Sequence, residues 1–283
     1  MPATFRFAPL ALALGLLLSA PAGASAPAPQ ATAAAHATGA DAFFRAFTDD
    51  WMKRQPNAAT GSRYFEDPAM QAQMDRQLTP STEAFADGTV ALARRGLAGL
   101  AALDVQAMDP TTRVSAELMR WQLETLIEGE GYRDLDFPLQ QFSGVNVGLP
   151  NLMTVVHPLR SAQDVDHYLA RLGQFDARMG EATARAHAQA ARGILPPDFI
   201  LDATIAQMRQ FIAPAPAANP LVTTLATRLP EIDAIAADRH GPLLARAESI
   251  VHEQVYPAWR AAIAELEAQR PRASADAGLG RFP

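Results

Sequence analysis

The sequence contains no cysteine, which excludes disulfide bonds, thiolate metal sites, a cysteine nucleophile and a lipid-modified N-terminal cysteine after export. Lysine occurs once, at Lys53, and every other basic side chain is an arginine. The net charge is −6, and no basic run or basic-aromatic patch is present. Nucleic acid and anionic membrane surfaces are therefore not expected partners.

Aromatic residues are also sparse, at 7% of the 283 residues, whereas alanine is abundant. Alanine has the highest helix propensity, and strands prefer β-branched and aromatic residues. Because 49% of the residues are hydrophobic, the chain is able to bury a sizeable core. We therefore predict an all-α fold, an irregular multi-helix bundle. No repeat of constant length is present, since the expected helices and linkers are uneven.

The N-terminus has the organisation of an export signal. Arg6 precedes an apolar stretch over residues 8–20, and small residues follow it. That stretch is too short for a comfortable membrane span, so we predict a signal peptide over residues 1–26, with an uncleaved anchor as the alternative. Residues 27–40, rich in alanine and proline, are expected to form a disordered linker to a helical domain over residues 41–283. This arrangement predicts a periplasmic or secreted protein without a stable membrane span after cleavage.

Proline, glycine and capping residues divide the remaining chain into helices. Expected helices cover residues 40–55, 79–103, 110–128, 161–192 (with a break near Gly180), 198–211, 221–228 and 244–270. Asp109-Pro110 and Thr79-Pro80 each place a capping side chain before a proline at the first helical position. Pro257 lies inside the last helix and is expected to kink it.

The spacing of apolar residues predicts which faces of two of these helices are apolar. In the helix that follows Pro110, one stripe carries Val114, Leu118, Trp121 and Thr125. In the last helix, one face is traced by Leu244, Ala247, Val251, Val255, Ala258, Ala262 and Leu266.

Residues 131–157 form the one long stretch predicted to be non-helical, because Pro138, Gly144, Gly148 and Pro150 interrupt it. A loop of this length inside a compact domain is often functional. Three of its residues are candidate contacts for a substrate, namely Gln140, Asn146 and His157. Two alternatives remain open: the loop is held by bonds between its own side chains and backbone, and His157 makes a local hydrogen bond.

No complete catalytic motif is present. His252-Glu253-Gln254-Val255-Tyr256 resembles the helical zinc motif His-Glu-x-x-His, but Tyr256 occupies the position of the second histidine. One imidazole is not sufficient to hold a catalytic zinc, so we interpret His252 and Glu253 as a solvated pair. Nucleophile-elbow and phosphate-loop motifs are also absent from the sequence. We therefore assign no catalytic residue, no metal ligand and no cofactor to this chain.

Six segments, taken in order, nevertheless resemble a known family. They are residues 47–61 (FTDDWMKRQPNAATG), 137–150 (FPLQQFSGVNVGLP), 164–172 (DVDHYLARL), 192–197 (RGILPP), 255–259 (VYPAW) and 278–283 (GLGRFP). Their order and spacing are similar to those of the bacterial domain-of-unknown-function 885 family, and the resemblance covers nearly all of residues 41–283.

The resemblance implies a relation to exported helical zinc peptidases of the gluzincin type, about twice as long as this chain. Their metal motif, His-Glu-x-x-Pro-Gly-His, belongs to the C-terminal half, and nothing in this sequence matches it. The chain is thus expected to be the N-terminal helical part of such a hydrolase, inactive alone. Its expected partners are a peptide substrate and the missing C-terminal half, which would supply the zinc. The alternatives are a stand-alone helical binding or scaffold protein of the envelope and a truncated remnant.

Overall fold

The computed structural model describes residues 30–282, with side chains from Gly39 onward, and within this range it contains helices and no strand. The all-α prediction is confirmed. The proposed signal peptide lies outside the described residues. The predicted linker over residues 27–40 is helical from Gln30 onward, because its alanine-rich sequence continues the first helix backward. None of the helices in the described range is both long and apolar enough to cross a membrane.

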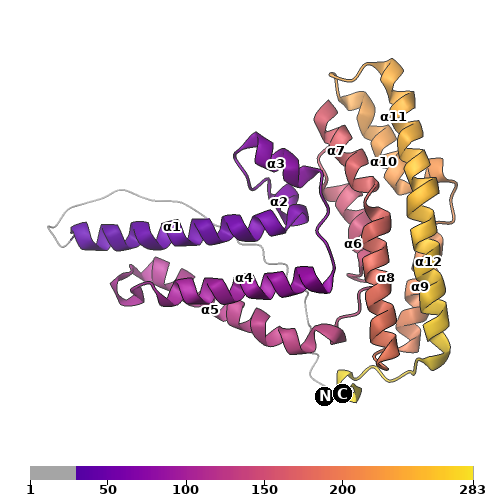
Figure 1. The fold of residues 1–283 in the computed structure, drawn as a ribbon. Coiled ribbons are helices and arrows are strands. Elements are labelled where there is room, and N and C mark those ends of the chain that lie inside the picture. The colour runs from indigo at the N-terminus through magenta and orange to yellow at the C-terminus, as the bar shows by residue number, and fades with distance from the viewer. Residues whose placement is uncertain (1–29, 283) are drawn as a thin grey trace, which may run out of the picture.

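The first part of the chain forms a lateral group of helices, here called the arm. It consists of α1 (Gln30–Arg54), α4 (Glu83–Ala101) and α5 (Pro110–Glu128), which extend sideways in Figure 1. These helices share a core of their own, formed by Ala40, Ala93, Leu100, Met108, Ala116 and Leu123, with Phe43, Phe44 and Phe47 packed against it. The short helices α2 (Pro56–Ser62) and α3 (Pro68–Asp75) lie between the arm and the rest of the molecule.

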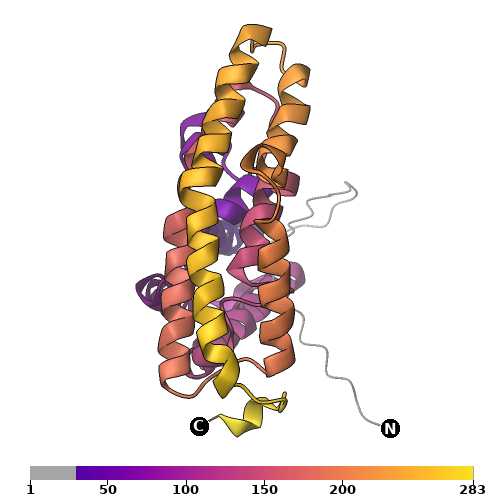
Figure 2. The same ribbon diagram turned by 90° about the vertical axis from the view of Figure 1, so that its right-hand side faces the viewer.

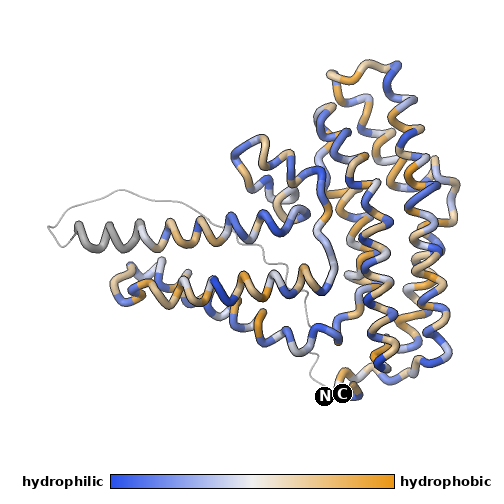
Figure 3. Tube along the Cα trace, in the orientation of Figure 1, coloured by the Kyte–Doolittle hydropathy of each residue, from blue (hydrophilic) through white to orange (hydrophobic). Residues whose placement is uncertain are grey.

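The second part of the chain is an upright bundle that contains the larger core. Its helices are α6 (Val145–Asn151), α7 (Ala162–Leu172), α8 (Phe175–Ala191), α9 (Asp198–Phe211), α10 (Pro220–Arg228), α11 (Ala237–Ile250) and α12 (Tyr256–Gln269). Helix α12 packs against α8 and α9, and Figure 2 shows these long helices running alongside one another. Hydrophobic and hydrophilic residues alternate along each helix, as expected for helices with one buried face (Figure 3).

Most predicted helix boundaries are confirmed, and their caps are visible. The Asp109 side chain accepts hydrogen bonds from the backbone N–H groups of Thr111 and Thr112, and Ser161 accepts one from Asp164. The predicted start at Thr79 is wrong: α4 begins after Thr82, because Thr79 exchanges two hydrogen bonds with Asn57 instead. The break predicted near Gly180 lies at residues 173–174, between α7 and α8.

Pro257 is accommodated by unusual backbone. Helices α11 and α12 are joined by a π-helical turn, Val251–Val255, and Pro257 lies in the first turn of α12. Proline has no backbone N–H and so cannot donate the usual helical hydrogen bond. The extra residue of the π turn shifts the hydrogen-bond pattern, so that this missing bond is accommodated. The predicted apolar face is confirmed, since Ala247, Val251, Val255, Ala262 and Leu266 are buried.

The long loop predicted over residues 131–157 is wrong in its extent. A 3-10 segment covers Gly129–Leu135, α6 follows, and a π-helical turn covers Leu152–Val156. Within this stretch, irregular backbone is confined to residues 136–144 and to His157. Pro150 lies inside α6 and is tolerated beside the π turn.

The predicted stripe on α5 lies on the outside of the arm. Val114, Leu118 and Trp121 are 62%, 50% and 56% exposed, whereas Ala116 and Leu123 of the same helix are buried. Periodicity correctly finds an apolar face here, but α5 carries two such faces and α4 covers only one.

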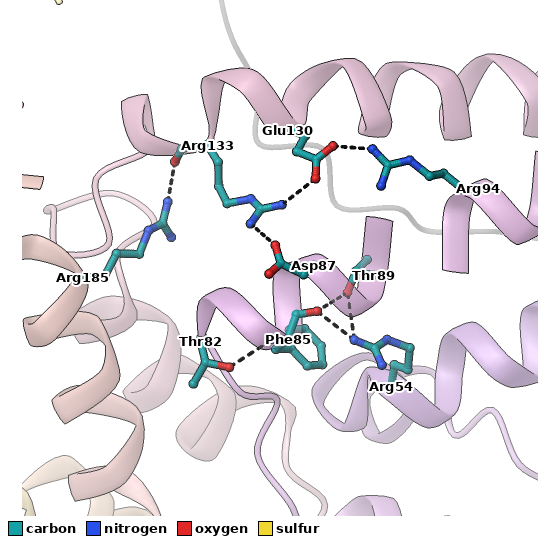
Figure 4. A network of polar contacts seen from close by, with 9 residues as sticks. All are labelled: Arg54, Thr82, Phe85, Asp87, Thr89, Arg94, Glu130, Arg133 and Arg185. Carbon is teal, nitrogen blue, oxygen red and sulfur yellow. Dashed lines mark hydrogen bonds and ion pairs between the residues drawn. The ribbon is translucent and has the colours of Figure 1, made fainter. Parts of the chain in front are cut away.

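A polar network joins the arm to the bundle (Figure 4). Arg133 Nη1 lies 2.6 Å from Asp87 Oδ1 on α4. The carbonyl oxygen of Arg133 accepts a hydrogen bond of 2.6 Å from Arg185 Nη2 on α8. Within the arm, Arg54 Nη2 donates to the Phe85 carbonyl oxygen at 2.8 Å. Such exposed pairs contribute little individually, so this network orients the arm more than it stabilises it.

Close approach within the arm depends on Gly96. A Cβ at this position would lie 2.5 Å from Phe47 Cε2 and 2.8 Å from Leu123 Cδ1. We expect Gly96→Val to lower the free energy of unfolding by about 1–3 kcal/mol in urea titrations, because the added atoms overpack the arm core. Gly180→Val is the matched control, since nothing lies within 4 Å of its position. Equal stabilities of the two variants would contradict the packing argument.

Candidate functional site around His157

Two of the predicted contact residues lie close together, Gln140 in the irregular segment before α6 and Asn146 in the first turn of α6. The Gln140 side chain accepts a hydrogen bond of 2.7 Å from the Phe142 N–H and donates one to Ser143. Asn146 Oδ1 accepts from the Gln140 N–H at 3.2 Å, and its Nδ2 donates to Gln207 Oε1 at 3.2 Å. Both amides thus bond to the surrounding fold, as the structural interpretation of the loop anticipates.

His157, the third predicted residue, lies elsewhere, directly after the π turn Leu152–Val156. Its side chain is 6% exposed, and Nε2 lies 3.0 Å from the Asp164 carbonyl oxygen. Nδ1 lies 3.2 Å from Nη1 of Arg171. Because a guanidinium only donates, Nδ1 is the acceptor and the imidazole proton resides on Nε2.

This environment keeps His157 neutral. Burial, together with the smaller effect of the Arg171 charge, lowers the pKa of the imidazole to about 4, against the opposing effect of the hydrogen bond to the Asp164 carbonyl. His157 therefore has no positive charge at neutral pH, and it acts as a hydrogen-bonded spacer between α7 and the π turn.

We expect the stability of the protein to fall as the pH is lowered from 6.5 toward 4. In that window the unfolded imidazole takes up a proton and the folded one does not, so the unfolded state binds more protons. The contribution of His157 amounts to as much as about 1.4 kcal/mol per pH unit. Urea titrations across this range should show a flatter dependence for His157→Gln than for the exposed control His252→Gln. Parallel curves for the two variants would contradict the assignment.

Behind His157 lies a buried arginine that sequence reasoning missed. The Arg171 side chain is 0% exposed. It donates hydrogen bonds to the carbonyl oxygens of Gln77, Pro56 and Met74 at 3.0, 3.3 and 3.0 Å, and to Thr60 Oγ1 at 2.6 Å. With His157, five partners from four different segments converge on one guanidinium. The available signal was its position three residues after the buried Tyr168, on the same side of α7.

A buried carboxylate balances this cation. Asp75 is 5% exposed, and its Oδ1 accepts hydrogen bonds from Thr60 Oγ1 at 2.7 Å and Gln71 Nε2 at 2.8 Å. Thr60 therefore stands between the two charges, donating to Asp75 and accepting from Arg171. Burial lowers the pKa of Arg171 to about 10 while the Asp75 charge raises it, so the guanidinium stays charged at neutral pH. This polar centre fixes α2, α3 and α7 relative to one another.

On the solvent side of His157 lies an open pocket with a volume of about 360 Å³. Its walls come from the end of α2, the π turn with the segment that follows it, and α10. Thr60, Gly61 and His157 lie on the side of the polar centre, and Val155, Val156 and Pro158 form an apolar wall. Gly61 sits close to that wall, since a Cβ there would lie 3.3 Å from Val156 Cγ1.

Three arginines also line the pocket, one from each of its three walls. Arg160 Nε lies 3.9 Å from Asp164 Oδ2, and Arg228 Nη1 lies 3.3 Å from Glu231 Oε2. Arg63 has φ 49°, the one positive value outside glycine in the described chain. Left-handed backbone costs a residue with a Cβ about 1–2 kcal/mol, so Arg63 occupies a position that favours glycine.

The described residues do not fit a catalytic metal site. Over residues 30–282, no three His, Asp or Glu side chains are grouped closely enough to hold a metal ion. His252 and Glu253 are exposed on the second π turn, whereas Tyr256 points into the core and donates to the Pro214 carbonyl oxygen at 2.8 Å. Both ring nitrogens of His157 are already hydrogen-bonded.

Comparisons with known proteins relate the chain to a bacterial family and to a longer protein of known structure. A family model described as "Bacterial protein of unknown function (DUF885)" matches residues 28–282. No curated protein matches. A solved structure described as a "putative lipoprotein" from Colwellia psychrerythraea aligns with 87% of this chain at a TM-score of 0.76 and 18% identity. The alignment covers 43% of that chain, so the present chain spans under half the length of its solved neighbour.

Proposed function

The chain belongs to the bacterial DUF885 family, and from that premise we propose that it forms the N-terminal helical part of an exported zinc metallopeptidase-like hydrolase. In this proposal the chain supplies the scaffold and one wall of the substrate cleft. Zinc and its water-activating glutamate come from polypeptide outside these 283 residues. When bound there, the metal would polarise the scissile carbonyl and lower the pKa of a water molecule.

The observation that carries this proposal is the mismatch in length. The chain aligns with 87% of its own residues but with only 43% of the solved neighbour. The described residues offer no group of metal ligands, so any metal-dependent step requires residues from elsewhere. The likeness to a lipoprotein structure is compatible with the export that the N-terminal segment predicts.

A second function, that of a stand-alone helical binding protein of the envelope, has an observation of its own in favour. The polar centre of Arg171, Thr60 and Asp75 is satisfied entirely by residues of this chain. The larger core is likewise formed from residues 78–266 of the same chain. These features favour a polypeptide that folds without a partner.

The two functions differ in what the gene encodes beyond Pro283. The proposed hydrolase predicts a downstream segment, in frame or in an adjacent reading frame, that carries His-Glu-x-x-Pro-Gly-His. Sequencing the locus tests this directly. If no such motif occurs downstream in any frame, the hydrolase proposal is wrong and the binding protein is favoured.

A further inference from the structure

We propose that the pocket beside His157 binds the C-terminal end of a peptide, with its free carboxylate at the arginines and an apolar last side chain against the valine wall. This inference deepens the proposed function, on which it rests for the choice of a peptide over another amphiphilic carboxylate. Binding itself requires only residues of this chain, and no metal.

The charge of the pocket calls for an anion. Arg63, Arg160 and Arg228 line it from three separate segments. Two carboxylates lie near them, Asp164 beside Arg160 and Glu231 beside Arg228. No ion pair within 4.0 Å is formed by Arg63 among the described residues. The excess cation matches a single carboxylate, which an arginine is able to bind through two parallel hydrogen bonds.

The apolar wall favours a ligand that carries an apolar group next to its negative charge. Val155 and Val156 are 73% and 39% exposed, and they line the same pocket as the three arginines. They are exposed because the π turn Leu152–Val156 carries them outward while Leu152 and Met153 enter the core. An inorganic phosphate would leave this wall in water, whereas an apolar side chain next to a carboxylate would cover it.

The size and rigidity of the pocket suit a short chain end. Its volume of about 360 Å³ lies toward the lower end of the range of about 300–1,000 Å³ for small-ligand sites. Its floor is preorganised, because His157 is held by Arg171 on one side and by the Asp164 carbonyl on the other. Preorganised contacts lose less entropy when a ligand binds.

A substitution of Arg63 tests ligand binding separately from protein stability. It holds a left-handed conformation that glycine adopts without strain, and its side chain is exposed. A residue selected only for stability at this helix end would be glycine. Arg63→Gly therefore removes a pocket cation while leaving the fold unchanged or more stable, which makes it a sharp test.

The experiment is calorimetric titration of the full chain, without added metal, with the acetylated dipeptide alanyl-leucine as the free acid. Its C-terminal amide and inorganic phosphate serve as the comparison ligands. We expect the acid to bind at least about tenfold more tightly than the amide, the difference expected for one lost charge-assisted contact. We expect inorganic phosphate to bind more weakly than the acid as well.

Two variants complete the test. We expect Arg63→Gly to weaken binding of the acid at least about tenfold, with an unchanged or raised Tm. Arg95→Gln, which removes an exposed arginine on α4 in the arm, should bind like the parent chain. The proposal is overturned if the acid does not bind, if the amide or phosphate binds equally well, or if Arg63→Gly binds like Arg95→Gln. Such results concern this pocket alone, whereas the downstream motif tests the hydrolase.

Discussion

Replacement of Arg171 by methionine is expected to lower the free energy of unfolding by about 3–5 kcal/mol, the typical effect of removing one partner of a buried charge pair. The substitution leaves Asp75 as a buried charge without its cation. It also removes the donor that serves the carbonyl oxygens of Gln77, Pro56 and Met74. Urea titration followed by circular dichroism measures the loss.

Two companion variants identify the cause of that loss. Arg171→Lys keeps the charge but has three N–H donors for the five partners, so we expect an intermediate loss. In a double-mutant cycle, Arg171→Met with Asp75→Asn should be less destabilised than the sum of the single changes. Full additivity, or an Arg171→Met variant as stable as the parent, would contradict the description of this centre.

Replacement of Trp259 by alanine is expected to cost about 3–5 kcal/mol, as for other large core aromatics. Trp259 on α12 is 0% exposed, and its ring lies 6.0 Å from the ring centroid of Phe175 on α8 and 5.0 Å from that of Phe211 on α9. The alanine variant removes the side chain through which α12 packs against α8 and α9. Thermal and urea unfolding both report the change.

Trp259→Phe is the control for this prediction. The indole Nε1 is buried without a hydrogen-bond partner, so phenylalanine sacrifices no hydrogen bond and removes an unsatisfied donor. We expect it to lose less than about half of what alanine loses, because most of the ring contacts remain. A phenylalanine variant as unstable as the alanine variant would indicate that the indole N–H has a partner after all.

Capping residues and apolar spacing predicted the helix features that depend only on residues close together in the sequence. Asp109-Pro110 and Ser161 are read correctly because a cap and the helix it begins lie within three residues of each other. The buried face of the last helix is also found, because apolar spacing does not depend on which neighbour covers it. The prediction that Thr79 caps a helix is wrong because its hydrogen-bond partner, Asn57, lies 22 positions earlier in the chain.

Tertiary structure determines the features that the sequence did not reveal. The proline and glycine residues of the 131–157 stretch resemble a loop, yet the bundle holds Val145–Asn151 in a helix and Leu152–Val156 in a π turn. Arg171 resembles a surface residue, because nothing nearby in sequence indicates the carbonyl groups of Pro56, Met74 and Gln77 that receive it.

The candidate site likewise has one residue that the sequence predicted and others that only the tertiary structure brings together. His157 was identified from its position after a long irregular stretch, and it does line the pocket. The cations around it were not identified, since Arg63, Arg160 and Arg228 are far apart along the chain and are brought together only by the packing of α2 and α10 around the π turn. Gln140 and Asn146 remain a pair that shapes the segment before α6.

The central claim is that this chain contributes structure and a binding surface to a hydrolase whose metal is held elsewhere. Its most direct test is zinc analysis of the purified chain, combined with peptide hydrolysis assays in the presence and absence of a chelator. The account predicts substoichiometric zinc and no chelator-sensitive turnover by this chain alone. One bound zinc per chain, together with turnover that the chelator abolishes, would contradict it.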